Sequence, residues 1–455
     1  MSLPGPRGDG AAAARSLRYH LVTDLGGVDR GRASWLPDGA ASGGVGWVPV
    51  NQVITPLDDI ASRNPWGSHG DRRLAADPST EVDLTLPDGR RLRGCICNIV
   101  ELDGSPWDVC ARTFLQRALS RLREEHRLQV LASFEHEFWL TRLESSAAAA
   151  RGTDSSAPGF SLLRFMAQEP FGSNLMQSLE RAGLEPEMFL PEFAPDQFEM
   201  TLKPGWGVSA ADRAVWAKAI TRVSASSTGY RASFTPIRSS GGIGSGVHVH
   251  FSLWDLDGNP VLHDPASPAG LSEIGAAFAG GLAKHMPALC ALTAPSVISY
   301  ERLKPHRWSA AYTCVGERNR EATLRICPTA GRDPVKLRRQ FNLEWRAADA
   351  TANPYLALGA LVSAGIEGIR HRHALPPLVN EDPSGLSDDE RGALGVERLP
   401  DSLPAALGAL RADDRARSWF PEPLLEAYLL LKETEAAACS RLSLDEICRR
   451  YETIF

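Results

Sequence analysis

The chain has 455 residues, 43% of them hydrophobic and 23% charged, which is typical of a globular protein with two or three domains. The net charge of −6, without a long basic run, excludes nucleic acid as the expected partner. The apolar stretches are too short to span a bilayer, and the 8 cysteines lack zinc-site spacing. We therefore expect a cytoplasmic protein with reduced thiols and no membrane partner.

The N-terminal part of the chain predicts short strands and turns. Residues 1–16 are rich in Pro, Gly and Ala without an apolar core, so we expect a disordered lead-in and not a signal peptide. A strand is predicted over residues 17–24. Alternating residues around an Asp-Gly turn predict a hairpin over residues 81–93. These elements predict a β-rich domain over residues 17–106.

The spacing of apolar residues becomes helical over residues 107–127, which places a domain boundary near residue 106. Residues 144–159 are rich in Ala, Ser and Gly and predict a flexible loop. Further helices are expected over residues 211–227, from Asn353-Pro354 onward, and through most of residues 402–455. The pattern predicts a larger α+β domain over residues 107–455.

Two carboxylates lie two residues apart in the segment Phe-Glu-His-Glu-Phe, residues 134–138. In a strand, Glu135 and Glu137 point the same way and repel each other unless a cation joins them, while His136 points to the other face. The alternative is a strand edge with two solvated carboxylates. The flanking Phe134 and Phe138 weaken that alternative, because the segment has the composition of a buried strand.

The same spacing of two recurs in one other segment, and a third segment supplies further carboxylates. His248 and His250 share one face of a predicted strand that follows a glycine-rich stretch, and such glycines permit close approach to a ligand. Two satisfied core histidines would be the ordinary alternative. Glu192 and Glu199 supply two more carboxylates. Oxygen-rich sites with some imidazole suit Mg²⁺ or Mn²⁺ better than zinc, so we expect a divalent-metal enzyme.

Several arginines lie in the segments that follow. Arg320 and Arg325 flank or enter an apolar strand-like stretch, and Arg302 and Arg346 add two more cations. A solvated basic face is the alternative. Carboxylates that bind metals, together with arginines that bind anions, are the general equipment of phosphoryl transfer. The chain has neither a Walker A sequence nor the dinucleotide fingerprint.

Taken in order, six motifs resemble the glutamine synthetase family, and the resemblance covers nearly the whole chain. The motifs are Phe-Glu-His-Glu-Phe (134–138), Glu-Phe-Ala-Pro-Asp-Gln-Phe-Glu (192–199), Gly-Ser-Gly-Val-His-Val-His-Phe-Ser-Leu (244–253), Ser-Tyr-Glu-Arg-Leu-Lys-Pro (299–305), Asn-Arg-Glu-Ala-Thr-Leu-Arg (319–325) and Glu-Trp-Arg-Ala-Ala-Asp-Ala-Thr-Ala-Asn-Pro-Tyr-Leu (344–356). The resemblance implies an N-terminal β-grasp domain and a catalytic domain with a curved antiparallel sheet flanked by helices. It also implies a homo-oligomer of two stacked hexamers, a dodecamer, with active sites between neighbouring subunits.

The family's chemistry has two steps: ATP phosphorylates the γ-carboxylate of glutamate, and an amine then displaces phosphate. The resemblance implies six ligands for two or three Mg²⁺ or Mn²⁺ ions, with Glu137, Glu192 and Glu199 on one ion and Glu135, His248 and Glu344 on a second. It implies nucleotide contacts at His250, Ser252, Arg325 and Asn342. It implies catalytic contacts at Arg302, Arg320 and Arg325, and glutamate contacts at Gly244, Glu137, Arg302 and Arg346.

Departures from the family pattern concern the amine. Trp308 stands where ammonia-using members carry a glutamate that closes the site and takes a proton, and indole cannot act as a base. Ile243 stands where an asparagine normally touches glutamate, and Asn342 where an arginine approaches the nucleotide. Asp58 or Asp59 is the candidate for the aspartate that a neighbouring subunit contributes to ammonium capture.

These departures resemble the γ-glutamylamide ligase branch of the family. We therefore expect an ATP-dependent ligase that joins the γ-carboxylate of glutamate to an organic amine. A monoamine with an alkyl or aromatic group is favoured over a polyamine, because no carboxylate can be assigned to a second ammonium group. The alternatives are ordinary glutamine synthesis from ammonium and a catalytically silent, structural member.

Overall fold

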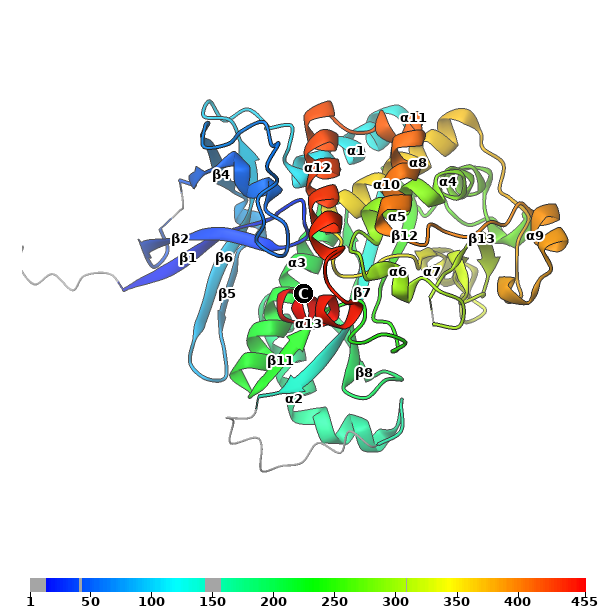
Figure 1. The fold of residues 1–455 in the computed structure, drawn as a ribbon. Helices are drawn as coiled ribbons and strands as arrows, with labels where there is room; N and C mark the ends of the chain where they lie inside the picture. Colours follow the sequence, from blue (N-terminus) through cyan, green and yellow to red (C-terminus); the bar gives the residue numbers. More distant parts are fainter. Residues whose placement is uncertain (1–13, 41–42, 144–156, 308) are drawn as a thin grey trace, which may run out of the picture.

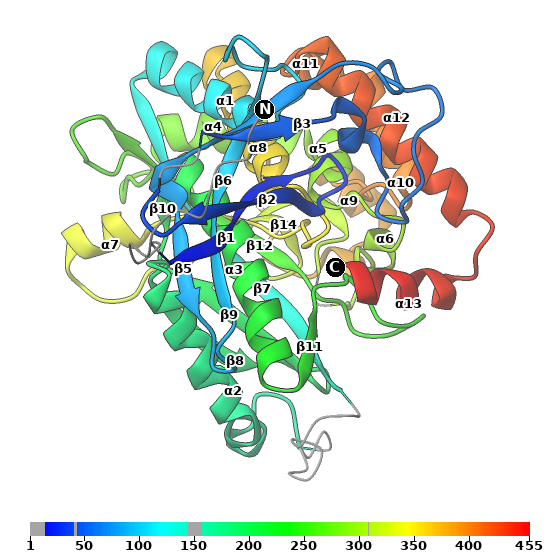
Figure 2. The ribbon, with the colours of Figure 1, turned by 90° about the vertical axis from the view of Figure 1, so that its left-hand side faces the viewer.

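The computed structural model describes residues 14–40, 43–143, 157–307 and 309–455 (Figure 1). Two sheets organise these residues. One is built from the N-terminal strands, and the second from strands that follow residue 128. In Figure 2 the N-terminal strands β1 and β2 lie nearest the viewer. The α+β class and the expected order, with a β-rich part first, are confirmed.

The N-terminal sheet has the strand order β2-β1-β6-β4-β3, with β5 paired to β6. Its strands are β1 (Arg15–Thr23), β2 (Asp29–Pro37), β3 (Val45–Trp47), β4 (Arg72–Ala76), β5 (Val82–Thr85) and β6 (Arg91–Val100). β1 and β6 run parallel, and the other pairs are antiparallel. The predicted strand is confirmed as β1, which begins inside the expected lead-in, and the predicted hairpin as β5 and β6.

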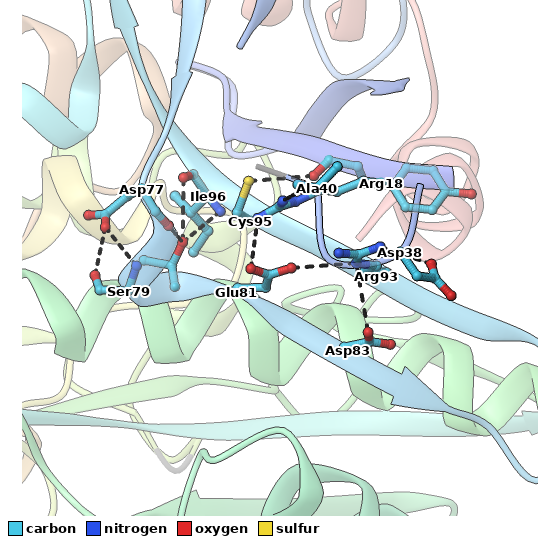
Figure 3. Close-up of polar contacts among 12 residues, drawn as sticks. Arg18, Asp38, Ala40, Asp77, Ser79, Glu81, Asp83, Arg93, Cys95 and Ile96 are labelled. Carbon is cyan, nitrogen blue, oxygen red and sulfur yellow. Dashed lines mark hydrogen bonds and ion pairs between the residues drawn. The ribbon is translucent and has the colours of Figure 1, made fainter. Parts of the chain in front are cut away.

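Paired charges from β1 and β6 link neighbouring segments of this sheet (Figure 3). Arg18 donates to the Glu81 carboxylate at 2.7 Å, and Arg93 donates to Asp38 at 3.1 Å. Asp83 lies 3.7 Å from Arg93. Both guanidinium groups are almost fully buried, and buried charges are retained where such partners neutralise them.

The second sheet has the order β13-β14-β15-β12-β7-β9-β8, and β10 and β11 also pair with β7. Its strands are β7 (Leu128–Arg142), β8 (Pro186–Pro191), β9 (Gln197–Leu202), β10 (Gly205–Trp206), β11 (Tyr230–Ser233), β12 (Val247–Asp255), β13 (Tyr312–Glu317), β14 (Ala322–Ile326) and β15 (Leu343–Trp345). All of its pairs are antiparallel except β13 with β14.

Thirteen α-helices are found in the part of the chain that the structure describes. They are α1 (Ala111–His126), α2 (Leu162–Arg181), α3 (Val208–Ser227), α4 (Glu273–Lys284), α5 (Met286–Thr293), α6 (Ser299–Arg302), α7 (Pro334–Gln340), α8 (Pro354–His371), α9 (Asp388–Leu394), α10 (Leu403–Ala412), α11 (Asp414–Arg417), α12 (Glu422–Cys439) and α13 (Leu444–Ile454). The helices expected over 107–127, 211–227, from Pro354 and through 402–455 are confirmed. The loop expected over 144–159 falls mostly outside the described residues.

Alternation along β7 separates a core face from an open face. From Leu131 to Phe138, residues at even numbers are buried, and those at odd numbers, including Glu135 and Glu137, are half-exposed. α3 and α1 contact β7, and α3 and α1 also pack against α8. His136 belongs to the core face, where burial lowers the pKa of its imidazole to about 3. The open face of the sheet is therefore free to carry the two carboxylates.

A buried polar network joins the N-terminal sheet to these helices. Arg112 on α1 donates to both oxygens of Asp212 on α3 at 2.9 Å, and to Asp77 beside the N-terminal sheet at 2.7 Å. Asn353 caps α8 by accepting from two backbone N–H groups, and its side chain donates to the carbonyl oxygens of Thr23 and Asp24. The expected boundary near residue 106 falls between β6 and α1.

Two further observations concern the class of protein. No helix among the described residues is long and apolar enough to cross a membrane. All 8 cysteines lie within the described residues, and each is buried and outside any disulfide.

Candidate active site

A cavity of about 720 Å³ lies over the open face of the second sheet. Acidic and basic side chains from six of its strands or their ends meet in its lining, including Glu135, Glu344, His248 and Arg325. Apolar side chains, among them Met188, line it as well. This volume is within the usual range for a small-molecule site.

Strand register places the charged groups in two neighbouring rows across the sheet. His248 on β12 lies opposite Glu135 on β7, and Glu344 on β15 lies opposite both His250 and Arg325. Because cross-strand partners share a face, residues far apart in sequence become neighbours. The charged side chains that alternate along single strands therefore form one group that spans the four strands β7, β12, β15 and β14.

The donor atoms of Glu135, His248 and Glu344 all lie within 4.8 Å of one another. Nδ1 of His248 is 3.5 Å from Oε2 of Glu135 and 3.7 Å from Oε1 of Glu344. Nε2 of His248 is buried and has no hydrogen-bond partner among the described residues. An imidazole nitrogen, here Nδ1, close to two carboxylates forms a suitable set of ligands for a divalent cation.

A second group with the same spacing consists of Glu137, Glu199 and, again, His248. Glu137 and Glu199 are direct cross-strand partners. Glu192 lines the same cavity but lies outside this group, where its carboxylate accepts from the backbone N–H of Phe193 at 3.2 Å. The two groups share an imidazole, so ions held by them would be close neighbours.

The carboxylates of the cavity have divergent pKa values. Burial would raise the pKa of Glu344, but Arg346, His248 and His250 outweigh it and lower the value to about 2. Burial also opposes ionisation of Glu135, yet hydrogen bonds from the two histidines lower its pKa. These two carboxylates are therefore ionised in the metal-free chain.

Glu192 and Glu199 behave in the opposite way. Burial, followed by the charge of Glu137, raises the pKa of Glu192 to about 7. Burial, followed by the charges of Glu135 and Glu137, raises the pKa of Glu199 to about 9. The cavity therefore contains more carboxylates than its own cations can neutralise, which is the electrostatic requirement of a divalent-metal site.

The arginines surround Glu344. Arg325 donates to its Oε2 at 2.8 Å, and Arg346 donates to its Oε1. Arg346 also donates to the carbonyl oxygen of Arg320, whose own side chain is exposed at the cavity. These contacts hold two guanidinium groups in place beside the carboxylates, where they can bind an anion.

The glycine-rich stretch before β12 packs against Arg302. A Cβ at Gly244 would lie 2.6 Å from Cγ of Arg302, and one at Gly246 would lie 2.1 Å from a guanidinium nitrogen of the same side chain. These glycines therefore let the backbone pack closely against the Arg302 side chain, and not against a ligand. Arg302 is 2% exposed and donates to the carbonyl oxygen of Arg346 at 3.3 Å, so it lies behind the cavity wall.

The structure does not bring every predicted residue into the cavity lining. Ser252 is buried and accepts from the indole of Trp254, and Asn342 bonds to Nδ1 of His250 at 2.9 Å. Asp58 and Asp59 lie in an exposed loop of the N-terminal sheet and do not line the cavity of their own chain. Trp308 lies outside the described residues.

Sequence reasoning missed four side chains near the site. Gln197 donates to Glu137 at 3.1 Å and to the carbonyl oxygen of Gly244 at 2.9 Å, and its spacing of two from Glu199 was an available signal. Cys327 lies 3.6 Å from Oε2 of Glu344. His306 and Glu321 line the cavity, and no pattern in the sequence indicated them.

Comparisons with known proteins agree with this geometry. A model of the glutamine synthetase catalytic domain matches residues 108–451, and one of the glutamine synthetase N-terminal domain matches residues 11–107. Gamma-glutamylpolyamine synthetase GlnA3 of Streptomyces coelicolor is 32% identical over 415 residues, covering 90% of this chain and 87% of that protein. Glutamine synthetase of Thermotoga maritima is 31% identical over 361 residues, covering 79% of this chain and 80% of that protein.

Solved structures show the same likeness. A structure described as a novel glutamine synthase homolog is 42% identical, with a TM-score of 0.86 and 100% of both chains covered. A GmaS/ADP complex is 26% identical, with a TM-score of 0.79, covering 95% of this chain and 96% of that one. The chain belongs to the glutamine synthetase family. Members of this family are ligases that use ATP and divalent metal ions, with glutamate and either ammonium or an amine as substrates.

Proposed function

We propose that the protein is an ATP-dependent ligase that joins the γ-carboxylate of glutamate to an organic amine through γ-glutamyl phosphate. The observation that carries this proposal is the cavity itself, which combines two overlapping groups of metal-ligand atoms with guanidinium groups of three arginines. The relative named for γ-glutamylpolyamine synthesis supports an organic acceptor. The intact acidic set argues against a silent, structural member.

The proposed roles follow from position. Glu135, His248 and Glu344 would hold one divalent ion, and Glu137 and Glu199 a second, with Glu192 completing it when it loses its proton. The nucleotide and the ions supply the phosphoryl group and the positive charge that stabilises its transfer.

Protein side chains then orient the anions. Arg320 and Arg325 would contact the transferring phosphoryl group, since both line the cavity beside the acidic set. Arg346 would bind the carboxylate of glutamate. Arg302, which donates to the carbonyl oxygen of Arg346, would hold that residue in place, and Gly244 lines the same cavity. His250, linked to Asn342, lies where it can contact a phosphate. We propose the family's assembly of two stacked hexamers, to which Asp58 or Asp59 would contribute from a neighbouring subunit.

The experiment that tests the proposal is a measurement of glutamate-dependent phosphate release with ammonium, ethylamine, aniline and putrescine as acceptors. We expect an organic amine to give a higher kcat/KM than ammonium. Ammonium as the best acceptor would make the protein an ordinary glutamine synthetase, and no release with any acceptor would make it a silent member.

The same panel applied to Trp308→Glu tests the sequence argument for the acceptor. An apolar amine gains about 0.8 kcal/mol per buried CH₂, whereas ammonium, which is strongly hydrated, gains nothing from an indole. Restoring the carboxylate should therefore shift preference toward ammonium. An unchanged preference would show that the residue at position 308 does not select the acceptor.

A further inference from the structure

One cavity carboxylate lies outside the proposed metal-ligand set. Glu321 lines the cavity from the turn between β13 and β14, next to Arg320. Its side chain is half-buried, and its carboxylate has no hydrogen bond or ion pair with the residues that the structure describes. A half-buried, unpaired carboxylate is costly unless it serves a ligand, so Glu321 calls for an explanation.

The turn that carries Glu321 is held rigidly. The backbone N–H of Glu321 donates to Oδ1 of Asn319 at 2.9 Å, and the Asn319 amide donates to the carbonyl oxygens of Val379 and Glu381 at 2.7 and 2.9 Å. Asn319 is itself buried. The position of Glu321 is therefore set by two segments of the chain, which is what a binding group requires.

Three charged groups influence Glu321. They are Asp382, His306 and Arg346, in that order of effect. Asp382 is already satisfied, because it accepts from the Ser384 hydroxyl at 2.7 Å and from the Ser384 backbone at 2.8 Å, and its other oxygen lies 3.5 Å from His306. Of these two carboxylates, Glu321 is the one without a partner among the described residues, and it is therefore available to a cation that enters from solvent.

Burial, followed by the charge of Asp382, raises the pKa of Glu321 above its ordinary value, while His306 and Arg346 lower it. A carboxylate with a raised pKa is a stronger proton acceptor than an ordinary one. Two other cavity carboxylates with a raised pKa, Glu192 and Glu199, belong to the proposed metal-ligand set, whereas Glu321 does not.

We propose that Glu321 binds the ammonium group of the acceptor amine and takes its first proton. This inference rests on the proposed ligase function. One proton passes from the ammonium nitrogen to a Glu321 oxygen. The freed lone pair forms the C–N bond to the γ-carbonyl carbon of γ-glutamyl phosphate as the C–O bond to phosphate breaks, and the second proton leaves the nitrogen for the departing phosphate.

Glu321 thereby supplies the carboxylate that position 308 lacks. A tryptophan at that position favours an acceptor that is neutral when it binds, whereas a carboxylate at Glu321 makes cationic alkylamines suitable as well. Apolar side chains of the same cavity, including Met188 and Leu190, can contact the carbon chain of such an amine.

The test compares cationic acceptors with a neutral one. Ethylamine and ammonium are cations near pH 7.5, while hydroxylamine is a neutral nucleophile there. Glu321→Gln should lower kcat/KM for ethylamine by about tenfold or more, through KM and kcat together, because a charge-assisted contact and a proton acceptor are both lost. The loss should shrink as pH rises toward the pKa of the amine, and kcat/KM for hydroxylamine should change by less than about threefold.

Two further variants serve as controls. Glu317→Gln removes a carboxylate from the neighbouring strand β13 that pairs with Arg318 and does not line the cavity, so it should behave as wild type. Glu321→Asp should recover part of the ethylamine activity. Equal losses with ethylamine and hydroxylamine, or no loss with ethylamine, would overturn the inference.

The experiment separates failure of the inference from failure of the proposed function. If ammonium proves the best acceptor of the wild type, the proposed function is wrong. Glu321→Gln still tests the inference in that case, because ammonium is also a cation that must lose a proton. A selective loss with ammonium would support the role of Glu321, and an unchanged kcat/KM would refute it.

Discussion

Glu137 and Glu199 face each other across the antiparallel strands β7 and β9, two carboxylates in direct cross-strand register. Glu137 accepts from the backbone N–H of Gly246 at 2.8 Å and from Gln197 at 3.1 Å. The Glu199 carboxylate accepts no hydrogen bond from the residues that the structure describes, and burial together with the charges of Glu135 and Glu137 raises its pKa to about 9. The metal-free chain therefore stores a proton where the proposed metal would bind.

The first prediction is that metal binding releases protons. At pH 7 the metal-free chain holds a proton on Glu199, with a pKa of about 9, and a partial proton on Glu192, with a pKa of about 7. Since carboxylates must be ionised to bind Mn²⁺, about one to two protons should leave per chain, and apparent affinity should rise between about pH 6 and 9. Titration calorimetry in buffers of different ionisation enthalpy measures this number, and Glu199→Gln should reduce it.

The same shift predicts how stability of the metal-free protein depends on pH. The folded chain keeps the Glu199 proton up to about pH 9, whereas the unfolded chain loses it near the ordinary glutamate value of 4.5. The folded state therefore binds more protons between these values, so Glu199 lowers the free energy of unfolding as pH rises through that window. Thermal unfolding of wild type and Glu199→Gln should diverge with rising pH, with the variant the more stable. A constant difference in Tm across the window would contradict this.

The second prediction concerns the acidic pair on β7. Glu135→Ala and Glu137→Ala should lower activity to below about 1% of wild type, because each removes a ligand from a proposed ion. Circular dichroism should remain that of the wild type, since both side chains lie on the open face of the sheet. Glu317→Ala is the matched control. Full phosphate release by either variant, or a crystal soaked in Mn²⁺ without density in the acidic set, would refute the metal assignment.

The third prediction concerns glutamate. Arg346→Ala should reduce kcat/KM for glutamate by about 30-fold or more, because losing one partner of a buried charge-assisted contact costs about 2–5 kcal/mol. Arg346 also pairs with Glu344, so Arg346→Lys, which keeps the charge, separates loss of charge from loss of the guanidinium fork. Faster ADP formation with another amino acid than with glutamate would show that the donor assignment is wrong.

The fourth prediction concerns the stability of the interface between the N-terminal sheet and the helices α1 and α3. Arg112→Met should lower the free energy of unfolding by about 3–5 kcal/mol, because it leaves Asp212 buried without its cation. Arg117 lies on the same helix and pairs with Asp108 at an exposed site, so Arg117→Met should cost less than about 1 kcal/mol. Denaturant unfolding of both variants measures the two changes in the free energy of unfolding. Equal changes would mean that the buried network does not stabilise this interface.

Local patterns in the sequence were sufficient for several helices and strands and for much of the acidic set. The alternation around Glu135 and Glu137 predicted a strand with both carboxylates on one face, because the period of two is a property of the strand alone. Asn353-Pro354 predicted the start of α8, because the capping oxygen accepts from backbone N–H groups only two and three residues ahead. The ordered motifs predicted the family.

What the tertiary structure decided depends on strand register and on contacts between distant segments. Glu344 meets His250 and Arg325 only because β15 lies between β12 and β14, an order that no local pattern specifies. The divergent pKa values of Glu135 and Glu199 arise from burial and from charges on neighbouring strands. Glu321 became a candidate for the acceptor site because folding brings its turn to the cavity while Asn319 ties that turn to the segment after Val379. The sequence by itself therefore determined which side chains could do this chemistry, and the packing of strands far apart in the chain decided which of them act together.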